Sequence, residues 1–330
     1  MRWNASVLVV LALLLSACAS GGKRGEAPDW IDGNSSAYPR SAWILGIGVA
    51  DNLAVARDRA RADLAKTFQV AISETSSDST RYSTAGSAAG ASDEYQAEVQ
   101  RDLVTRTSQV LEGVTVPETW TDASGRVHAL AVLNRSQAAM RLRQDIAGLD
   151  AAAASLLERA RSANDDFERA KLAIEVVDNQ RRRATAQHML QAVDATGQGV
   201  APRWPLAQLE ADLDTALSRI RLRAEGEGEW GRLLGGSLAA AGFNVSEGAS
   251  HVARLNVDVV EMPVRQGWHW RRAVAVLDLS GPEGRSLGQR RWEFKESATD
   301  AGTAEMRLRE AIGRTLEAEA RDAVLGIIGK

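Results

Sequence analysis

The sequence predicts an α+β protein in which two small α+β domains are joined by an antiparallel helical hairpin, behind a lipoprotein signal peptide. Alternating apolar residues typical of strands occur in two separate parts of the chain, and a proline-free stretch with helical spacing lies between them. The length of 330 residues also exceeds that of one ordinary domain. The predicted parts are a signal peptide (1–17), a tether (18–27), a first α+β domain (28–133), a helical hairpin (134–202) and a last α+β domain (203–330).

The composition excludes some classes of function. The chain is 45% hydrophobic and 25% charged, as in ordinary globular proteins. Its formal net charge is −3, whereas nucleic-acid-binding proteins usually carry a basic surface, so we expect no nucleic acid partner. Four histidines and one cysteine provide few metal ligands. We therefore expect neither a metal site nor a cofactor.

The first residues have the pattern of a secretory leader. A positive start is followed by the apolar run Val7–Leu15 and by the small residues Ser16 and Ala17. The tetrapeptide Leu15–Cys18 resembles a bacterial lipobox, in which cleavage precedes the cysteine and the thiol takes a diacylglycerol. A plain secreted protein with a chance cysteine is the alternative. It is disfavoured because a single unpaired thiol is unusual in an oxidising compartment.

The resemblance to lipoproteins implies three acyl chains on Cys18, which would attach the protein to a membrane. Ala19 follows the cysteine, whereas in many Gram-negative lipoproteins an Asp at this place signals retention in the inner membrane. The expected location is therefore the periplasmic face of the outer membrane.

The first domain is expected to begin with a strand and a helix. Residues Ala42–Ala50 form an apolar run of strand length, and apolar residues then recur at three or four positions from Leu53 to Phe68, after a possible N-cap at Asp51. Gly46 and Gly48 suggest a dinucleotide loop, but Asp51 stands where the third glycine of that motif belongs. We therefore assign the two glycines to close packing of the helix on the sheet.

The rest of this domain is predicted to contain a mobile insertion, a helix and a hairpin. Residues 83–92 are all Ser, Thr, Ala or Gly and bury too little apolar surface to be ordered. A helix is expected over 93–107. Strands are expected at 110–121 and 126–133, joined by a turn at 122–125.

Several short motifs of this domain resemble the LPP-twenty lipoprotein family and the first domain of FlgT-type flagellar outer-membrane ring proteins. They are Pro28-Asp29-Trp30, the Gly46-Ile47-Gly48 strand, Leu111–Val114, Glu118–Trp120 and Gly125–Ala131. The resemblance spans about residues 28–147. It implies an α+β fold and an envelope location, and it implies no catalytic residue.

The middle of the chain is predicted to be helical. Apolar residues keep alternating steps of four and three from Leu142 to Val177, which would give a long coiled coil if the register were unbroken. The polar cluster 162–166 contains good N-cap residues and favours two antiparallel helices instead. The run Arg181–Arg183 is interpreted as a solvated face, with a phosphate or anionic-lipid contact as the alternative.

The last domain is predicted to have the order strand, helix, strands, helix. A short helix that begins near Pro205 precedes it. The strands are expected at 220–223, 243–246, 254–260, 269–279 and 289–296, and the helices at 229–241 and 303–328. This order resembles the small α+β domain at the start of the translocation protein TolB.

No catalytic motif is present. The four histidines are dispersed, without metal-ligand spacing, and no nucleophile motif or Walker pattern occurs. We therefore expect a protein that is not an enzyme.

One local concentration of residues suggests a contact site. Tryptophan beside arginine is a composition favoured at protein interfaces. The candidate residues are Trp268, Trp270, Arg271 and Arg272, expected to lie opposite Arg291 and Trp292 across neighbouring strands. The alternative is cross-strand packing that stabilises the domain.

These expectations favour a structural or assembly module of the cell envelope that acts through contacts with envelope proteins or with itself. The alternative is a regulator or ligand-binding module that contacts peptidoglycan or a periplasmic enzyme.

Overall fold

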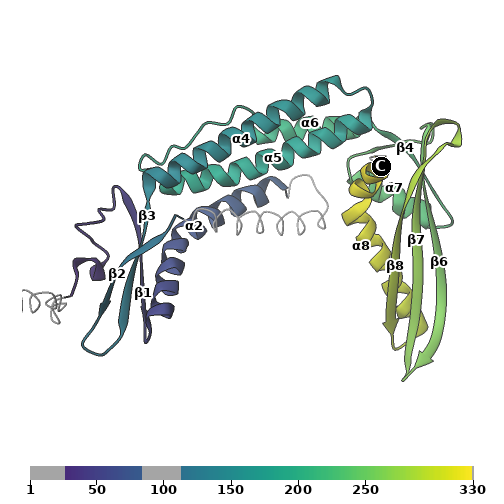
Figure 1. The fold of residues 1–330 in the computed structure, drawn as a ribbon. Helices are drawn as coiled ribbons and strands as arrows, with labels where there is room; N and C mark the ends of the chain where they lie inside the picture. The colour runs from purple at the N-terminus through teal and green to yellow at the C-terminus, as the bar shows by residue number, and fades with distance from the viewer. Residues whose placement is uncertain (1–26, 84–112, 329–330) are drawn as a thin grey trace, which may run out of the picture. The chain divides into compact units, whose positions relative to one another are not determined.

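The computed structural model describes residues 27–83 and 113–328 (Figure 1). Several predicted parts lie outside the described residues. They are Cys18, the tether as far as residue 26, the insertion expected at 83–92 (beyond its first residue) and the helix expected at 93–107. The described part contains six α-helices and sheets of three and five strands, which confirms the α+β class. The chain divides into two compact units, residues 1–64 with 114–133 and residues 65–113 with 134–330.

The first unit is built on a three-stranded sheet with the order β1-β3-β2. The strands are β1 (Trp43–Ala50), β2 (Thr115–Thr121) and β3 (Val127–Asn134), and β2 pairs antiparallel to β3. Trp30, in the short helix η1 (Asp29–Asp32), is buried in the small core with Leu130 and Val132. Its indole Nε1 donates a hydrogen bond to Glu118 Oε2 over 2.7 Å, which joins η1 to β2.

The glycines of β1 allow helix α2 (Leu53–Ser83) to lie against the strand. A Cβ atom at Gly46 would collide with the backbone of Ala60, and one at Gly48 with the backbone of Ala56. The predicted packing role of both glycines is thus confirmed. The predicted N-cap at Asp51 is wrong, because Asn52 Oδ1 accepts the Val55 N–H at 3.0 Å.

Two long helices of the second unit follow β3: α4 (Arg135–Ser162) and α5 (Asp166–Val193). Asn134 caps α4 and Asp165 caps α5 through their side chains. Arg135, at the start of α4, donates to the carbonyl of Val193, at the end of α5, over 3.1 Å. The two helices are therefore antiparallel, which confirms the predicted hairpin with its turn at 162–166 and excludes a single long coiled coil.

Arg183 corrects the interpretation of the arginine run. It is buried, and its guanidinium donates to Asp150 Oδ1 and to the carbonyls of Val200 and Ala201 at 3.0–3.1 Å. A solvated face and an anionic-lipid contact are both wrong for this residue, because its guanidinium is buried and bonds to groups of the chain itself. Arg183 joins the hairpin to the segment that leads into α6 (Leu206–Arg219).

The second unit ends in a five-stranded sheet with the order β5-β4-β6-β7-β8. β4 is parallel to β5 and to β6, and the other pairs are antiparallel. Helices α7 (Trp230–Ala240) and α8 (Ala301–Ile328) pack against this sheet and share its core (Figure 1). The strands are β4 (Arg221–Gly226), β5 (Asn244–Val245), β6 (His251–Arg265), β7 (Trp268–Ser280) and β8 (Ser286–Ala298).

Strand β6 continues five residues beyond its predicted end at Val260. Gln266 and Gly267 form the turn to β7 with φ values of 53° and 78°, as in the tight turns that join twisted antiparallel strands. Pro263 is tolerated because the pairing of β6 with β7 is irregular between Met262 and Arg265, a place where a proline need not donate to the ladder. None of the described helices is long and apolar enough to cross a membrane.

Candidate functional site

The predicted contact residues do not lie on a single surface. Along β7, Arg271 is on the sheet face that the helices cover and is only 8% exposed, whereas Arg272 points to the opposite face and is exposed. Trp268 is 42% exposed and Trp292 only 9%. Strand alternation places neighbours on opposite faces, so the cluster in the sequence is divided between core and surface.

The expected pairing across β7 and β8 is also wrong. Arg291 lies opposite Val276, and Trp292 lies opposite Ala275. The residues that face Trp270 and Arg272 on β8 are Ser297 and Lys295. Arg291 is thus displaced from Arg272 by four residues, or about 13 Å at the usual rise of a strand. The register follows from the turn after Ser280, which the alternation of apolar residues does not determine.

Two of the six residues stabilise the domain. Trp292 is buried and its Nε1 donates to Glu319 Oε2 of α8 over 2.7 Å. The buried Arg271 has an ion pair with Glu261 of β6 at 3.0 Å. For these residues the packing alternative holds, and they are not available to a partner.

The other four predicted residues lie on the sheet face that the helices do not cover, or at the end of that face. They are Trp268, Trp270, Arg272 and Arg291. Lys295 Nζ lies 4.7 Å from the ring centroid of Trp270, a cation–π distance. Arg272 and Arg291 both contact Glu293, at 3.0 and 3.1 Å, and their hydrogen bonds hold the pKa of that carboxyl below its usual range. The charges of this face are therefore largely compensated within the sheet.

The end of the sheet is more apolar. β6 and β7 extend beyond the end of β4, and we call residues 256–272 the β6–β7 arm. Large apolar side chains are exposed along this arm: Val259, Val260, Val264 and Trp268. Strand alternation places Val259 and Val260 on opposite faces of β6, so the arm exposes apolar groups on both of its faces. The arm is the candidate contact surface, and it retains only Trp268, Trp270 and Arg272 as accessible or partly accessible members of the predicted set.

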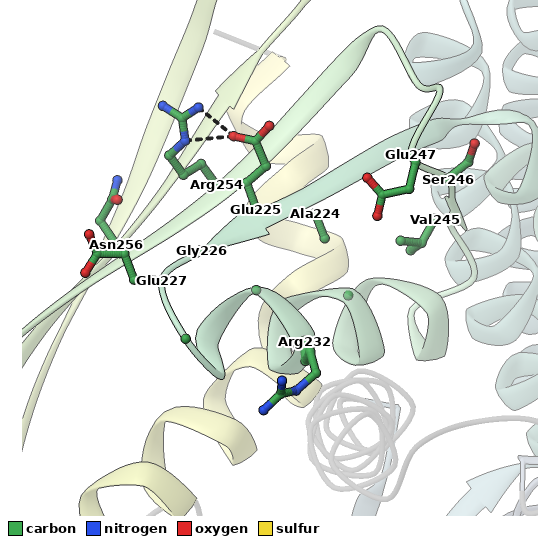
Figure 2. Close-up of a pocket in the computed structure, with 13 residues that line it drawn as sticks. Ala224, Glu225, Gly226, Glu227, Arg232, Val245, Ser246, Glu247, Arg254 and Asn256 are labelled. Carbon is green, nitrogen blue, oxygen red and sulfur yellow. Dashed lines mark hydrogen bonds and ion pairs between the residues drawn. The ribbon is translucent and has the colours of Figure 1, made fainter.

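A cavity of about 700 Å³ opens at the carboxyl end of β4 (Figure 2). Its wall includes Gly226, Gly228 and Gly231, which have the spacing Gly-x-Gly-x-x-Gly between a strand and a helix. A Cβ at Gly226 would lie 2.7 Å from the Gly231 nitrogen, and Gly228 has a φ of +60°. The glycines thus permit the tight turn and the close approach of α7 to β4. The sequence analysis missed this motif, although its spacing is visible in the sequence.

Carboxylates surround the mouth of the cavity. Figure 2 shows Glu225 against Arg254, whose guanidinium donates to Glu225 Oε2 at 2.5 and 3.0 Å and lowers the pKa of that carboxyl. Glu227 and Glu247 line the same cavity, and no ion pair with a described residue is seen for either. Arg232 lines the cavity as well, so its charged lining consists of three Glu and two Arg and is only slightly acidic. The glycine motif is explained by packing.

The histidines take local partners. His128 Nε2 lies 3.0 Å from Asp122 Oδ2 at the β2–β3 turn, and His251 packs on the ring of Phe167 with 5.1 Å between centroids. Within residues 27–83 and 113–328, no three side chains of His, Cys, Asp or Glu are placed to hold a metal ion.

Comparison with known proteins finds a family match in the first part of the chain. Residues 28–134 match the family model of the LPP20 lipoprotein, which confirms the resemblance to the LPP-twenty family, whereas those to FlgT- and TolB-type domains stay predictions. The crystal structure of the secreted protein HP1454 from Helicobacter pylori shares 12% identity, with 83% of this chain and 97% of that chain covered and a TM-score of 0.40. A minor lipoprotein from Acinetobacter baumannii shares 13%, covering 33% and 89%, with a TM-score of 0.25. No curated protein sequence matches the chain significantly.

Proposed function

We propose that this chain, an envelope lipoprotein by the match of residues 28–134 to the LPP20 lipoprotein family, is anchored in the outer membrane and faces the periplasm. There it acts as a structural or assembly module through protein–protein contacts and not as an enzyme. The family match carries the proposal. It agrees with the lipobox-like Leu15–Cys18, which lies outside the described residues.

The anchor follows from the chemistry of Cys18. A thioether-linked diacylglycerol and an amide-linked acyl chain together bury many methylenes, each worth about 0.8 kcal/mol, so release from the membrane is negligible. The small and polar residues 19–25 suit a tether between the anchor and Pro28. Ala19 in place of Asp favours the outer membrane.

The β6–β7 arm supports the contact role. It exposes valines and a tryptophan on an ordered strand pair, so a partner would meet side chains that are already held in place. Such preorganised apolar residues lose little conformational entropy on binding.

The anchor is tested by metabolic labelling with an alkyne fatty acid in cells that produce the full-length protein. The wild type is expected to carry the label and to sediment with outer membranes. Cys18→Ser is expected to lose the label, because a hydroxyl does not form the thioether. As a matched control, Ala19→Asp is expected to keep the label and to move to the inner membrane. Label that persists in Cys18→Ser refutes the lipoprotein assignment.

A further inference from the structure

Strand β6 has a long free edge. β4 pairs with β6 only from His251 to Leu255, because the chain turns away from the sheet at Gly226–Gly228 to enter α7. β6 continues to Arg265 and stays paired with β7 on its other side (Figure 1). In the part of the chain that the structure describes, no strand pairs with the β4 side of β6 beyond Leu255.

The register determines which backbone groups point to this edge. The amides of Asn244 and Ser246 in the β5 segment donate to the carbonyls of Ile220 and Leu222, so even-numbered residues of the β4 segment face β5. Odd-numbered residues of β4 therefore face β6. In a parallel ladder, a residue forms its hydrogen bonds with the two residues that flank the one opposite it. Arg223 lies opposite Val252 and therefore bonds with the residues on either side of Val252. Odd-numbered residues of β6 thus direct their N–H and C=O groups toward the β4 side.

Continued alternation places the N–H and C=O groups of Val257, Val259 and Glu261 on the free edge. The edge is long and rich in valine, and Val260 is 51% exposed. Natural edge strands are usually short, charged or interrupted by proline, because an open edge is a template for another strand. The segment Asn256–Met262 contains no proline, since Pro263 follows it, and its only charged side chains are the acidic Asp258 and Glu261.

We infer that the free edge of β6 over Asn256–Met262 accepts an extended segment of a partner protein as an added strand. This inference deepens the proposed assembly role by naming its binding mode. The added strand would lie in line with β4, and its backbone would satisfy the groups of Val257, Val259 and Glu261. Main-chain hydrogen bonds provide affinity in this mode, while alternate side chains provide specificity.

The charges around the edge identify the partner segment as basic. Glu227 follows the end of β4, and Asp258 lies on the edge strand itself; no ion pair with a described residue is seen for either. Glu247 adds a third carboxylate in the cavity beside β4, where Arg232 is the one lining cation for which no ion pair with a described residue is seen, so these four charges are net acidic. A second copy of β6 would bring another Asp258 to this edge, and the like charges would repel each other. A foreign strand that alternates apolar residues and carries lysine or arginine at its end fits both the valines and the carboxylates.

The test uses the mature, acylated full-length chain in detergent, so it does not depend on where the anchor places the protein. The probe is a fluorescein-labelled peptide of alternating valine and threonine with lysine at both ends. Saturable binding is expected by fluorescence anisotropy, and the same peptide with terminal glutamates is expected to bind at least about tenfold more weakly. Absence of saturable binding of the lysine peptide overturns the inference.

Two pairs of variants separate strand addition from other contacts. Val259→Pro removes an edge N–H and is expected to weaken binding about tenfold or more, whereas Val259→Thr keeps the donor and the branched shape and should bind as the wild type does. Glu227→Lys with Asp258→Lys leaves the β6 backbone donors in place and should reverse the preference between the two peptides. Equal binding by Val259→Pro and Val259→Thr, with Val259→Pro still folded by circular dichroism, contradicts strand addition.

Amide hydrogen exchange gives a direct readout of the added strand. The peptide should slow exchange at Val257, Val259 and Glu261, because their N–H groups gain acceptors. It should leave Asn256 and Asp258 unchanged, because these face β7. Protection that is equal at odd and even positions would show rigidification without pairing. A concentration-dependent dimer of the peptide-free chain that Val259→Pro abolishes would assign the edge to self-pairing instead.

Discussion

Arg183 of α5 donates from Nε to Oδ1 of Asp150 in α4 over 3.1 Å, and its second guanidinium nitrogen reaches the carbonyls of Val200 and Ala201. One buried side chain thereby connects both helices of the hairpin to the segment that follows them. A charge in such a place is tolerated only when its hydrogen bonds are satisfied. The arginine thus belongs to the architecture of the second unit.

Arg183→Leu is expected to lower the free energy of unfolding by roughly 3 kcal/mol, because the three oxygens that Arg183 contacts lose their donor. The matched control is Arg159→Leu on the exposed face of α4, for which a change below about 0.5 kcal/mol is expected. Urea denaturation followed by circular dichroism measures both. Equal effects of the two substitutions would contradict the structural role of Arg183.

Gly48→Ala is expected to destabilise the first unit by at least about 1–3 kcal/mol, since the added methyl would collide with the α2 backbone at Ala56. Gly148→Ala is the control, because no atom lies within 4 Å of a Cβ added there. In the interior of α4 the same substitution should stabilise by about 0.5–1 kcal/mol. Thermal melts of the two variants should therefore shift in opposite directions, and a neutral Gly48→Ala would refute the close packing of α2 on β1.

Trp292→Ala is expected to cost roughly 3–5 kcal/mol, because it empties a buried volume between β8 and α8. Trp268→Ala, at the exposed end of β7, should change stability by less than about 1 kcal/mol. Denaturation of each variant compares the same truncation at a buried and an exposed site. A large loss in Trp268→Ala would show that the end of the arm belongs to the core.

His251 should make stability depend on pH. Burial lowers its pKa, Arg285 adds to the effect, and Asp165 opposes it. Because the pKa is lower in the folded than in the unfolded state, this contribution is fully present above the ordinary histidine value of 6.5 and is lost as the pH falls through the folded-state value. His251→Gln should therefore lose less stability than the wild type between about pH 8 and pH 5. Urea titrations of both proteins at both pH values measure the difference. An equal loss of unfolding free energy in His251→Gln and in the wild type would contradict the prediction.

Local patterns predicted most elements of the fold. The helix in the last part of the chain has Leu308, Ile312 and Leu316 on its buried face, as its spacing predicts, because three- and four-residue steps lie on one side of any α-helix. The polar residues at 162–166 likewise marked the hairpin turn, since Asp165 caps α5 whichever surface the helix meets. The candidate contact site was only partly predicted. Alternation placed Trp270 and Arg271 on opposite faces, but it did not indicate which face the helices would cover.

The sequence by itself therefore determined the α+β class, the order of most strands and helices and the resemblance of the first domain, because each depends on residues close together in the chain. The leader and its cysteine are likewise predicted from local sequence alone. Only the tertiary structure decided that Arg183 is buried, that Arg291 lies opposite Val276, and that β6 extends beyond β4. These depend on strand register and on contacts between distant segments. Turn geometry and the packing of whole layers determine such contacts, and local periodicity is compatible with several of them.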